Sequence, residues 1–145
     1  MMETSAEKKP AKPVPRPAPE SLPYWEAARA HRLSLPRCNE CEKFWFPPSR
    51  SCPHCLSPNF AFQDVSGRGR IYSFVTIHRP YHPAFEDEVP YVVALVELEE
   101  GPRLLTSILG IEPENVRCEM PVEVVFDDVD PENTIPKFRL FRDAG

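Results

Sequence analysis

The sequence predicts a mainly β protein that combines an N-terminal helix, a four-cysteine zinc ribbon and a C-terminal five-stranded barrel. Two Cys-x-x-Cys motifs lie ten residues apart, a spacing typical of chains that close around one tetrahedral metal ion. Segments rich in Val, Ile, Tyr and Phe follow them, with Gly, Pro, Asn or Asp between the segments. Because the ribbon is too small to bury much apolar surface, the second half of the chain must supply the main core.

Composition divides the chain into four segments. We expect a disordered Pro/Lys-rich tail over residues 1–21, the helix over 22–36, the ribbon over 37–64 and the barrel domain over 65–142. The tail carries a proline at every second position from Pro13 to Pro19. Such a segment has too little hydrophobicity to offset the entropy lost on ordering, so it should sample extended polyproline conformations.

The helix is expected to span about residues 22 to 34. Ser21 is a plausible N-cap, and Pro36 disfavours helical geometry in the residue before it. An apolar stripe at helical spacing would pack on the ribbon, and its members are Tyr24, Ala28, His31 and Leu35. Arg29, Arg32 and Arg37 either complement the helix dipole or form a local basic spot for a phosphate-bearing ligand.

The metal site is predicted from the stretch CNECEKFWFPPSRSCPHC, whose ligands are Cys38, Cys41, Cys52 and Cys55. Four thiolates satisfy the tetrahedral preference of Zn(II) and leave no open position for a catalytic water, so the zinc is structural. Iron is the nearest alternative, since it accepts the same ligands. Two disulfides or four ordinary buried cysteines are the other interpretations, and both fit less well with a chain that shows no apolar export signal.

The barrel is predicted from five strand-like segments, which run from Arg70 to His78, Tyr91 to Leu98, Arg103 to Leu109, Val122 to Phe126 and Lys137 to Phe141. A short helical turn fits Glu112 to Arg117, between the third strand and the fourth. Five antiparallel strands with this insertion are what a small Greek-key barrel of the OB type needs. Tyr91 to Val96 is apolar throughout, as for a strand covered on both faces. Gly67 and Gly69 favour a bulge in the first strand over a phosphate-cradling loop.

Charge limits the classes of partner. The chain of 145 residues has a net charge of −5, and beyond its first 23 residues it is more acidic still. An acidic body argues against general binding to a phosphate backbone, which relies on Lys and Arg. No run approaches the roughly 18 apolar residues of a membrane span. We therefore expect a cytoplasmic protein, with Cys118 as a passive thiol.

The sequence contains no recognisable set of catalytic residues. It has no Gly-x-Ser-x-Gly elbow, no Walker loop and no His-Glu-x-x-His motif. The long aromatic segment from Arg79 to Pro90 could carry a binding function, because long loops in compact domains tend to do so. His78 and His82 are interpreted as loop residues, since Pro80 and Pro83 prevent the helical spacing that would align them on a metal.

Read in order, these motifs resemble a known family. The helix YWEAARAHRLSLPRC, the knuckles CNEC and CPHC, and then SGRGRIYSFVTIHRP, PYVVALVELEEGPRLLT and MPVEVVFDDVD are similar to the acyl-CoA-associated OB-fold proteins of domain-of-unknown-function family thirty-five (DUF35). The match runs from about Leu22 to Arg142. It implies a rubredoxin-like zinc ribbon ahead of an OB barrel. It also implies a non-catalytic partner of thiolase-type acyltransferases or MaoC-type enoyl-CoA hydratases.

From this resemblance we expect an accessory subunit, not an enzyme by itself, in lipid, steroid or polyketide-type metabolism. Coenzyme A carries several phosphates and a long flexible arm, so the residues that could contact an acyl-CoA are Arg29, Arg32, Arg37, Tyr72, Phe74, Tyr81 and Phe85. The expected anchors for an enzyme partner are Trp45, Phe46 and Phe85. Two alternatives stay open: a single-stranded nucleic-acid-binding protein, and a redox protein with iron in the four-cysteine site.

Overall fold

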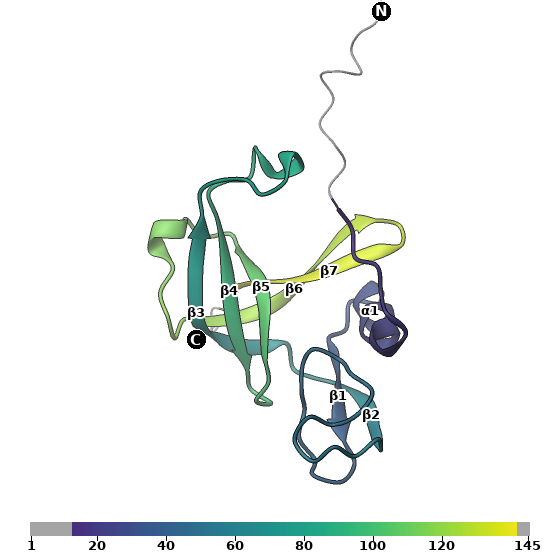
Figure 1. Cartoon of the computed structure of the whole chain (residues 1–145). Helices are drawn as coiled ribbons and strands as arrows, with labels where there is room; N and C mark the ends of the chain where they lie inside the picture. Colours follow the sequence, from purple (N-terminus) through teal and green to yellow (C-terminus); the bar gives the residue numbers. More distant parts are fainter. Residues whose placement is uncertain (1–12, 142–145) are drawn as a thin grey trace, which may run out of the picture.

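The computed structural model describes residues 13–141, which form a closed barrel with a smaller two-stranded ribbon and one helix beside it (Figure 1). The elements are the 3-10 helix η2 (Pro19–Ser21), α1 (Leu22–Arg29), β1 (Ser34–Cys38), β2 (Phe60–Asp64), β3 (Arg68–Ile77), η3 (Pro83–Phe85), β4 (Tyr91–Leu98), β5 (Arg103–Leu109), η4 (Pro113–Asn115), β6 (Pro121–Asp130) and β7 (Asn133–Leu140). The predicted mainly β class, with a ribbon followed by a five-stranded OB barrel, is confirmed.

The barrel closes in the strand order β3-β4-β5-β7-β6. Its neighbouring strands are antiparallel except for β5 and β7, which pair in parallel over Ile108–Phe138 and Leu109–Arg139. Side chains that point inward from every strand fill the interior, and the fully buried ones include Ile71, Val96 and Phe138. The closure is short, because β5 and β7 pair at only two positions and β6 pairs with β3 only over Pro121, Val122 and Glu123, so the rest of the β6–β7 hairpin lies outside the closed part of the barrel.

The barrel differs from expectation in several details: β6 and β7 are longer than the predicted segments Val122 to Phe126 and Lys137 to Phe141, and β5 pairs with β7 in parallel. β4 alternates between buried and half-buried residues, so only its inner face is fully covered, although its sequence is apolar throughout. The bulge in β3 lies between Ile71 and Ser73 and not at the glycines. Gly69 instead passes close to the Glu97 backbone, where a Cβ atom would collide with the carbonyl oxygen. Gly67 takes a φ of 78° and accepts a hydrogen bond from the Val124 N–H at 2.8 Å.

The helix is shorter than the sequence predicts. α1 ends at Arg29, the Arg32 N–H donates back to the Ala27 carbonyl at 2.9 Å, and His31 takes a left-handed φ of 60°. The prediction of a helix to residue 34 is therefore wrong. The reason is long-range: residues 34–38 form β1, which pairs with β2 from Ser34–Asp64 to Cys38–Phe60. Strand pairing with a segment far along the chain overrides a helical apolar stripe.

The segment before α1 was expected to belong to a disordered tail over residues 1–21, and its first twelve residues lie outside the described part of the chain. Residues 19–21 form η2, and Pro13 and Val14 lie against the barrel. Neither helix α1 nor the 3-10 helices of residues 13–141 are long and apolar enough to cross a membrane.

Candidate metal centre and binding surfaces

Two knuckles with the same backbone pattern position the four cysteines. In the first, the Glu42 N–H donates to the Cys38 carbonyl at 3.0 Å, and in the second the Leu56 N–H donates to the Cys52 carbonyl at 2.8 Å. Glu42 and Leu56 both take left-handed backbone conformations, with φ of 66° and 67°. Each knuckle therefore turns the chain back sharply, so that both of its sulfurs face the other knuckle.

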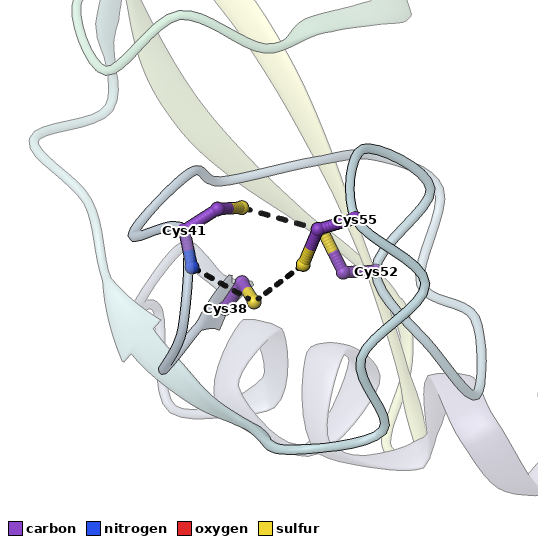
Figure 2. Close-up of side chains that lie close together, drawn as sticks. All are labelled: Cys38, Cys41, Cys52 and Cys55. Carbon is purple, nitrogen blue, oxygen red and sulfur yellow. Dashed lines mark hydrogen bonds between the residues drawn. The ribbon is translucent and has the colours of Figure 1, made fainter.

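The four sulfurs converge on a common centre (Figure 2). The Sγ atoms of Cys38 and Cys55 are 3.5 Å apart, those of Cys41 and Cys52 are 3.6 Å apart, and all four lie within 4.8 Å of one another. None of the four is in a disulfide. Ligands at about 2.3 Å from a tetrahedral zinc are separated by about 3.8 Å, so the cluster fits this ion. Within residues 13–141 no other group of His, Cys, Asp or Glu is arranged to hold a metal.

Backbone N–H groups donate hydrogen bonds to the cysteine sulfurs and so favour the thiolate form. The Cys41 and Glu40 N–H groups donate to the Cys38 Sγ at 3.4 and 3.3 Å, and the His54 N–H donates to the Cys52 Sγ at 3.3 Å. The Cys41 N–H, helped by that of Glu40 and opposed by burial, lowers the pKa of Cys38 to about 6. The Ser57 N–H lowers the pKa of Cys55, but the neighbouring Cys38 sulfur and burial outweigh it and raise that pKa to about 12. Four thiolates this close need a cation between them.

The aromatic residues of the ribbon form its small core. Trp45 is 4% exposed, its indole Nε1 donates to the Ser49 Oγ at 3.0 Å, and its ring packs edge-on against Phe60 with centroids 5.1 Å apart. The expectation that Trp45 anchors a partner is therefore wrong, because the ring is buried inside the ribbon. Phe46 is half-buried and packs on Tyr24 of α1 at 5.4 Å, so it joins the ribbon to the helix.

The three arginines proposed for the phosphates of an acyl-CoA do not form one basic spot. Arg32 is paired with Asp64 at 2.7 Å, and Arg37 with Glu42 at 3.6 Å. Arg29 lines a polar hollow together with acidic residues, which are Glu26, Asp128 and Asp130. Carboxylates next to each arginine weaken any attraction for phosphate.

The four aromatic residues proposed for the apolar arm are also separated. Phe74 packs against the barrel core, whereas Tyr72 lies on the outer surface under the Arg103 guanidinium, which is 3.8 Å from the ring centroid. Tyr81 is 84% exposed on the loop after β3. Of the four, Phe85 alone lines an apolar groove, where Tyr91 is its neighbour.

Sequence reasoning missed the outer face of the barrel. Val75 on β3 and Leu105 on β5 are 57% and 69% exposed, and Leu95 of β4 lies between the two strands on the same side. Next to them, Glu97 binds both Arg70 and Arg103, and Glu119 also binds Arg70, so the charges at this end of the face are neutralised. The sequence does contain a signal for this face. β4 and β5 have apolar residues at their outward positions as well as their inward ones, whereas a strand whose outer side contacts water does not need apolar residues there.

A four-cysteine zinc ribbon beside a closed OB barrel defines a class of small β proteins. In this class the ribbon is suited to a structural metal ion, and the outer surface of the barrel is available for binding. The chain matches the model described as "ChsH2, rubredoxin-like zinc ribbon domain" over residues 25–61. It matches "ChsH2, C-terminal OB-fold domain" over residues 62–127. It is 37% identical over 112 residues to a "DUF35 domain-containing scaffold protein" of Methanothermobacter thermautotrophicus, covering 76% of this chain and 84% of that protein. The chain belongs to the DUF35 family.

Other relatives bear the names of enzyme subunits. A "Probable enoyl-CoA hydratase alpha subunit" of Thermomonospora curvata is 44% identical over 135 residues, which cover 92% of this chain but only 42% of that protein. A "Benzoylsuccinyl-CoA thiolase subunit BbsA" of Thauera aromatica is 30% identical over 111 residues, covering 77% of this chain and 74% of that protein. The solved structure "Ltp2-ChsH2(DUF35) aldolase" superposes with a TM-score of 0.79 at 43% identity, covering 87% of this chain and 98% of that one.

Proposed function

We propose that this chain is a non-catalytic accessory subunit that binds a thiolase-like or MaoC-type hydratase enzyme and helps it handle acyl-CoA thioesters. The observation that carries the proposal is the four-cysteine site, which is closed by its own ligands and so has no position for a substrate. The names of the relatives, which include hydratase and thiolase subunits, support the choice of partner. Lipid, steroid or polyketide-type metabolism in the cytoplasm is the setting we infer.

The outer face of β3, β4 and β5 supports a scaffold role. A partner that docks on the face of a sheet must bury the side chains that point outward from it. Val75 and Leu105 offer such side chains, with Tyr72 beside them. A cluster of two arginines and two glutamates, Arg70, Arg103, Glu97 and Glu119, borders this surface, and burying paired charges costs less than burying single ones. We propose this face as the main contact with the enzyme, and the half-buried Phe46 as a secondary one.

The acyl-CoA itself would be bound jointly with the enzyme. The candidate arginines are engaged with carboxylates or lie beside them, and the candidate aromatics do not meet in one groove. A shared site, completed by residues of the enzyme, is therefore the form of CoA binding that we propose. It follows that the isolated chain binds acyl-CoA weakly.

The proposal is tested by tagged purification from the native host, mass spectrometry of the proteins retained, and reconstitution of the purified pair. We expect a thiolase-like or MaoC-type subunit in a fixed ratio with this chain. The pair should turn over an acyl-CoA faster than the enzyme alone, and this chain alone should not turn it over. Turnover at an enzyme-like rate by the isolated chain would contradict the proposal.

A further inference from the structure

A second surface, separate from the metal centre, is an apolar groove on the outside of the barrel. Its volume is about 240 Å³, and residues of four strands line it, among them Tyr91, Leu109, Val129 and Ile135. Phe85 of η3 also lines it. The remaining wall comes from Pro13 and Val14, which precede α1 in the chain.

The groove exists because β5 and β7 pair over only two residue positions. Beyond this short contact the β6–β7 hairpin extends away from the barrel toward α1, and the loop between β3 and β4 rises on the other side (Figure 1). In OB barrels generally, the face formed by the second and third strands, with the loops that flank it, binds extended ligands. Here those strands are β4 and β5, so the groove lies where an OB barrel presents its ligand face.

The charges around the groove are unsuited to a polyanion. The loop that closes it carries Glu86, Asp87 and Glu88 in sequence, and Glu88 lines the groove. The cation in its lining, Lys137, is only 20% exposed and is bound to Asp127 at 2.7 Å. Nucleic-acid strands and coenzyme A phosphates need uncompensated Lys or Arg side chains. An apolar floor with an acidic rim instead suits a segment that is both apolar and cationic.

We propose that the groove is a peptide site for an extended, basic, proline-rich segment, and that residues 13–17 of this chain, PVPRP, are its own ligand. Pro13 and Val14 already form its wall. This segment carries Arg16, the sequence just before it contains Lys8, Lys9 and Lys12, and residues 8–17 include no acidic residue, which complements the acidic loop. Its prolines favour the polyproline II conformation, and aromatic-lined grooves bind that conformation at little entropic cost.

This arrangement gives the segment a regulatory consequence. Because it is tethered, the segment competes with any external ligand at a high effective concentration. A partner that uses the ligand face of the barrel must displace it first. The inference does not depend on which enzyme this chain serves, since it concerns the barrel and its own leading segment.

The test uses the full chain and its amide NMR spectrum. Val14→Asp places a carboxylate in the apolar groove beside Asp127 and Glu88, and we expect it to release the segment. Amide shifts should then change at residues 85–91, 107–109 and 127–137 and leave the ribbon signals in place. A synthetic peptide of residues 5–18 should bind this variant saturably, and bind the wild-type chain at least about tenfold more weakly.

Two further substitutions in the Val14→Asp background make the test specific. Val129→Asp, on the groove floor, should abolish peptide binding, with Phe85→Ser in its place if the barrel signals lose their dispersion. Leu105→Asp, on β5 but outside the groove, should leave binding unchanged. Equal peptide affinity for the wild type and Val14→Asp would overturn the proposal. So would shift changes that avoid the groove, or binding of a fifteen-residue oligothymidylate there in preference to the peptide.

Discussion

The imidazole Nε2 of His31 lies 3.0 Å from each carboxylate oxygen of Asp128, although 97 residues separate the two in the chain. The His31 ring also stacks on Phe126, with centroids 5.2 Å apart and planes at 9°. His31 occupies the turn where α1 ends and the chain enters the ribbon. This contact therefore fixes the start of the ribbon on β6 of the barrel, and it accounts for a histidine on what the sequence presents as an apolar helical stripe.

Asp128 should make the stability of the chain depend on acid pH. A hydrogen bond from the Thr134 hydroxyl, and then the bond with His31, hold the pKa of Asp128 below its ordinary value of 3.8. The stabilisation is present above that value and is lost as the pH falls through the lower pKa of the folded state. Asp128→Asn should thus lower the Tm at neutral pH and reduce the further loss between about pH 5 and about pH 2. Calorimetry checks this, with the exposed Glu132→Gln as control, and an unchanged neutral Tm would contradict it.

Removal of the metal should unfold the two cysteine knuckles and spare the barrel, whose core includes Leu35 of β1. Cys38, Trp45 and Cys52 form a core cluster separate from that of the barrel, so the barrel does not need them for its packing. A structural zinc contributes about 10 kcal/mol or more to small modules of this kind. A strong chelator, or Cys52→Ser, should release one zinc per chain and shift Trp45 emission to the red. Trp25→Phe isolates that signal, and strand circular dichroism should persist.

The same experiment decides between zinc and iron. Tetrathiolate iron absorbs visible light, whereas zinc, with a filled d shell, does not. We expect a colourless preparation with one zinc per chain by elemental analysis. A red preparation with stoichiometric iron would instead support the redox alternative.

The parts of the structure that could be predicted from sequence are those with local signals. The four cysteines lie within one stretch, 38–55, and β4 and β5 have the bounds that their sequences predict, Tyr91–Leu98 and Arg103–Leu109. The parts that could not be predicted depend on distant partners. The end of α1 is set by pairing of residues 34–38 with residues 60–64, and the role of Trp45 by its packing on Phe60.

The candidate binding residues show the same division. Arg32 and Arg37 are basic in the sequence, but their ion pairs with Asp64 and Glu42 appear only in the folded chain. The groove, likewise, is built from loop 78–90, β5 and the β6–β7 hairpin. No periodic pattern in the sequence indicates that these three segments lie next to one another. Composition indicates that aromatic residues are present. It does not indicate which of them face one another.

Leu56→Gly should stabilise the ribbon. Leu56 takes a φ of 67° and its side chain is 76% exposed, so it bears the strain of the left-handed conformation with almost no packing in return. Removing the side chain relieves that strain but adds freedom to the unfolded chain, and the net gain should be about 0.5 to 1 kcal/mol. The measure is the chelator concentration at which half of the Trp45 signal is lost. Leu105→Gly, in a strand, should show no such gain, and a lower midpoint for Leu56→Gly would contradict the argument.

Leu105→Asp should weaken the complex with the enzyme while leaving this chain folded. Leu105 is 69% exposed on the proposed contact face, so a carboxylate there costs little in the free chain but would be buried without a partner in the complex. We expect at least about tenfold weaker association, equivalent to about 1.4 kcal/mol, by calorimetry with the purified enzyme. Leu56→Asp, at a position that is 76% exposed on the ribbon knuckle, is the matched control and should bind like the wild type. If both variants bound normally, the enzyme would dock elsewhere, and the outer face of β3, β4 and β5 would lose its proposed role.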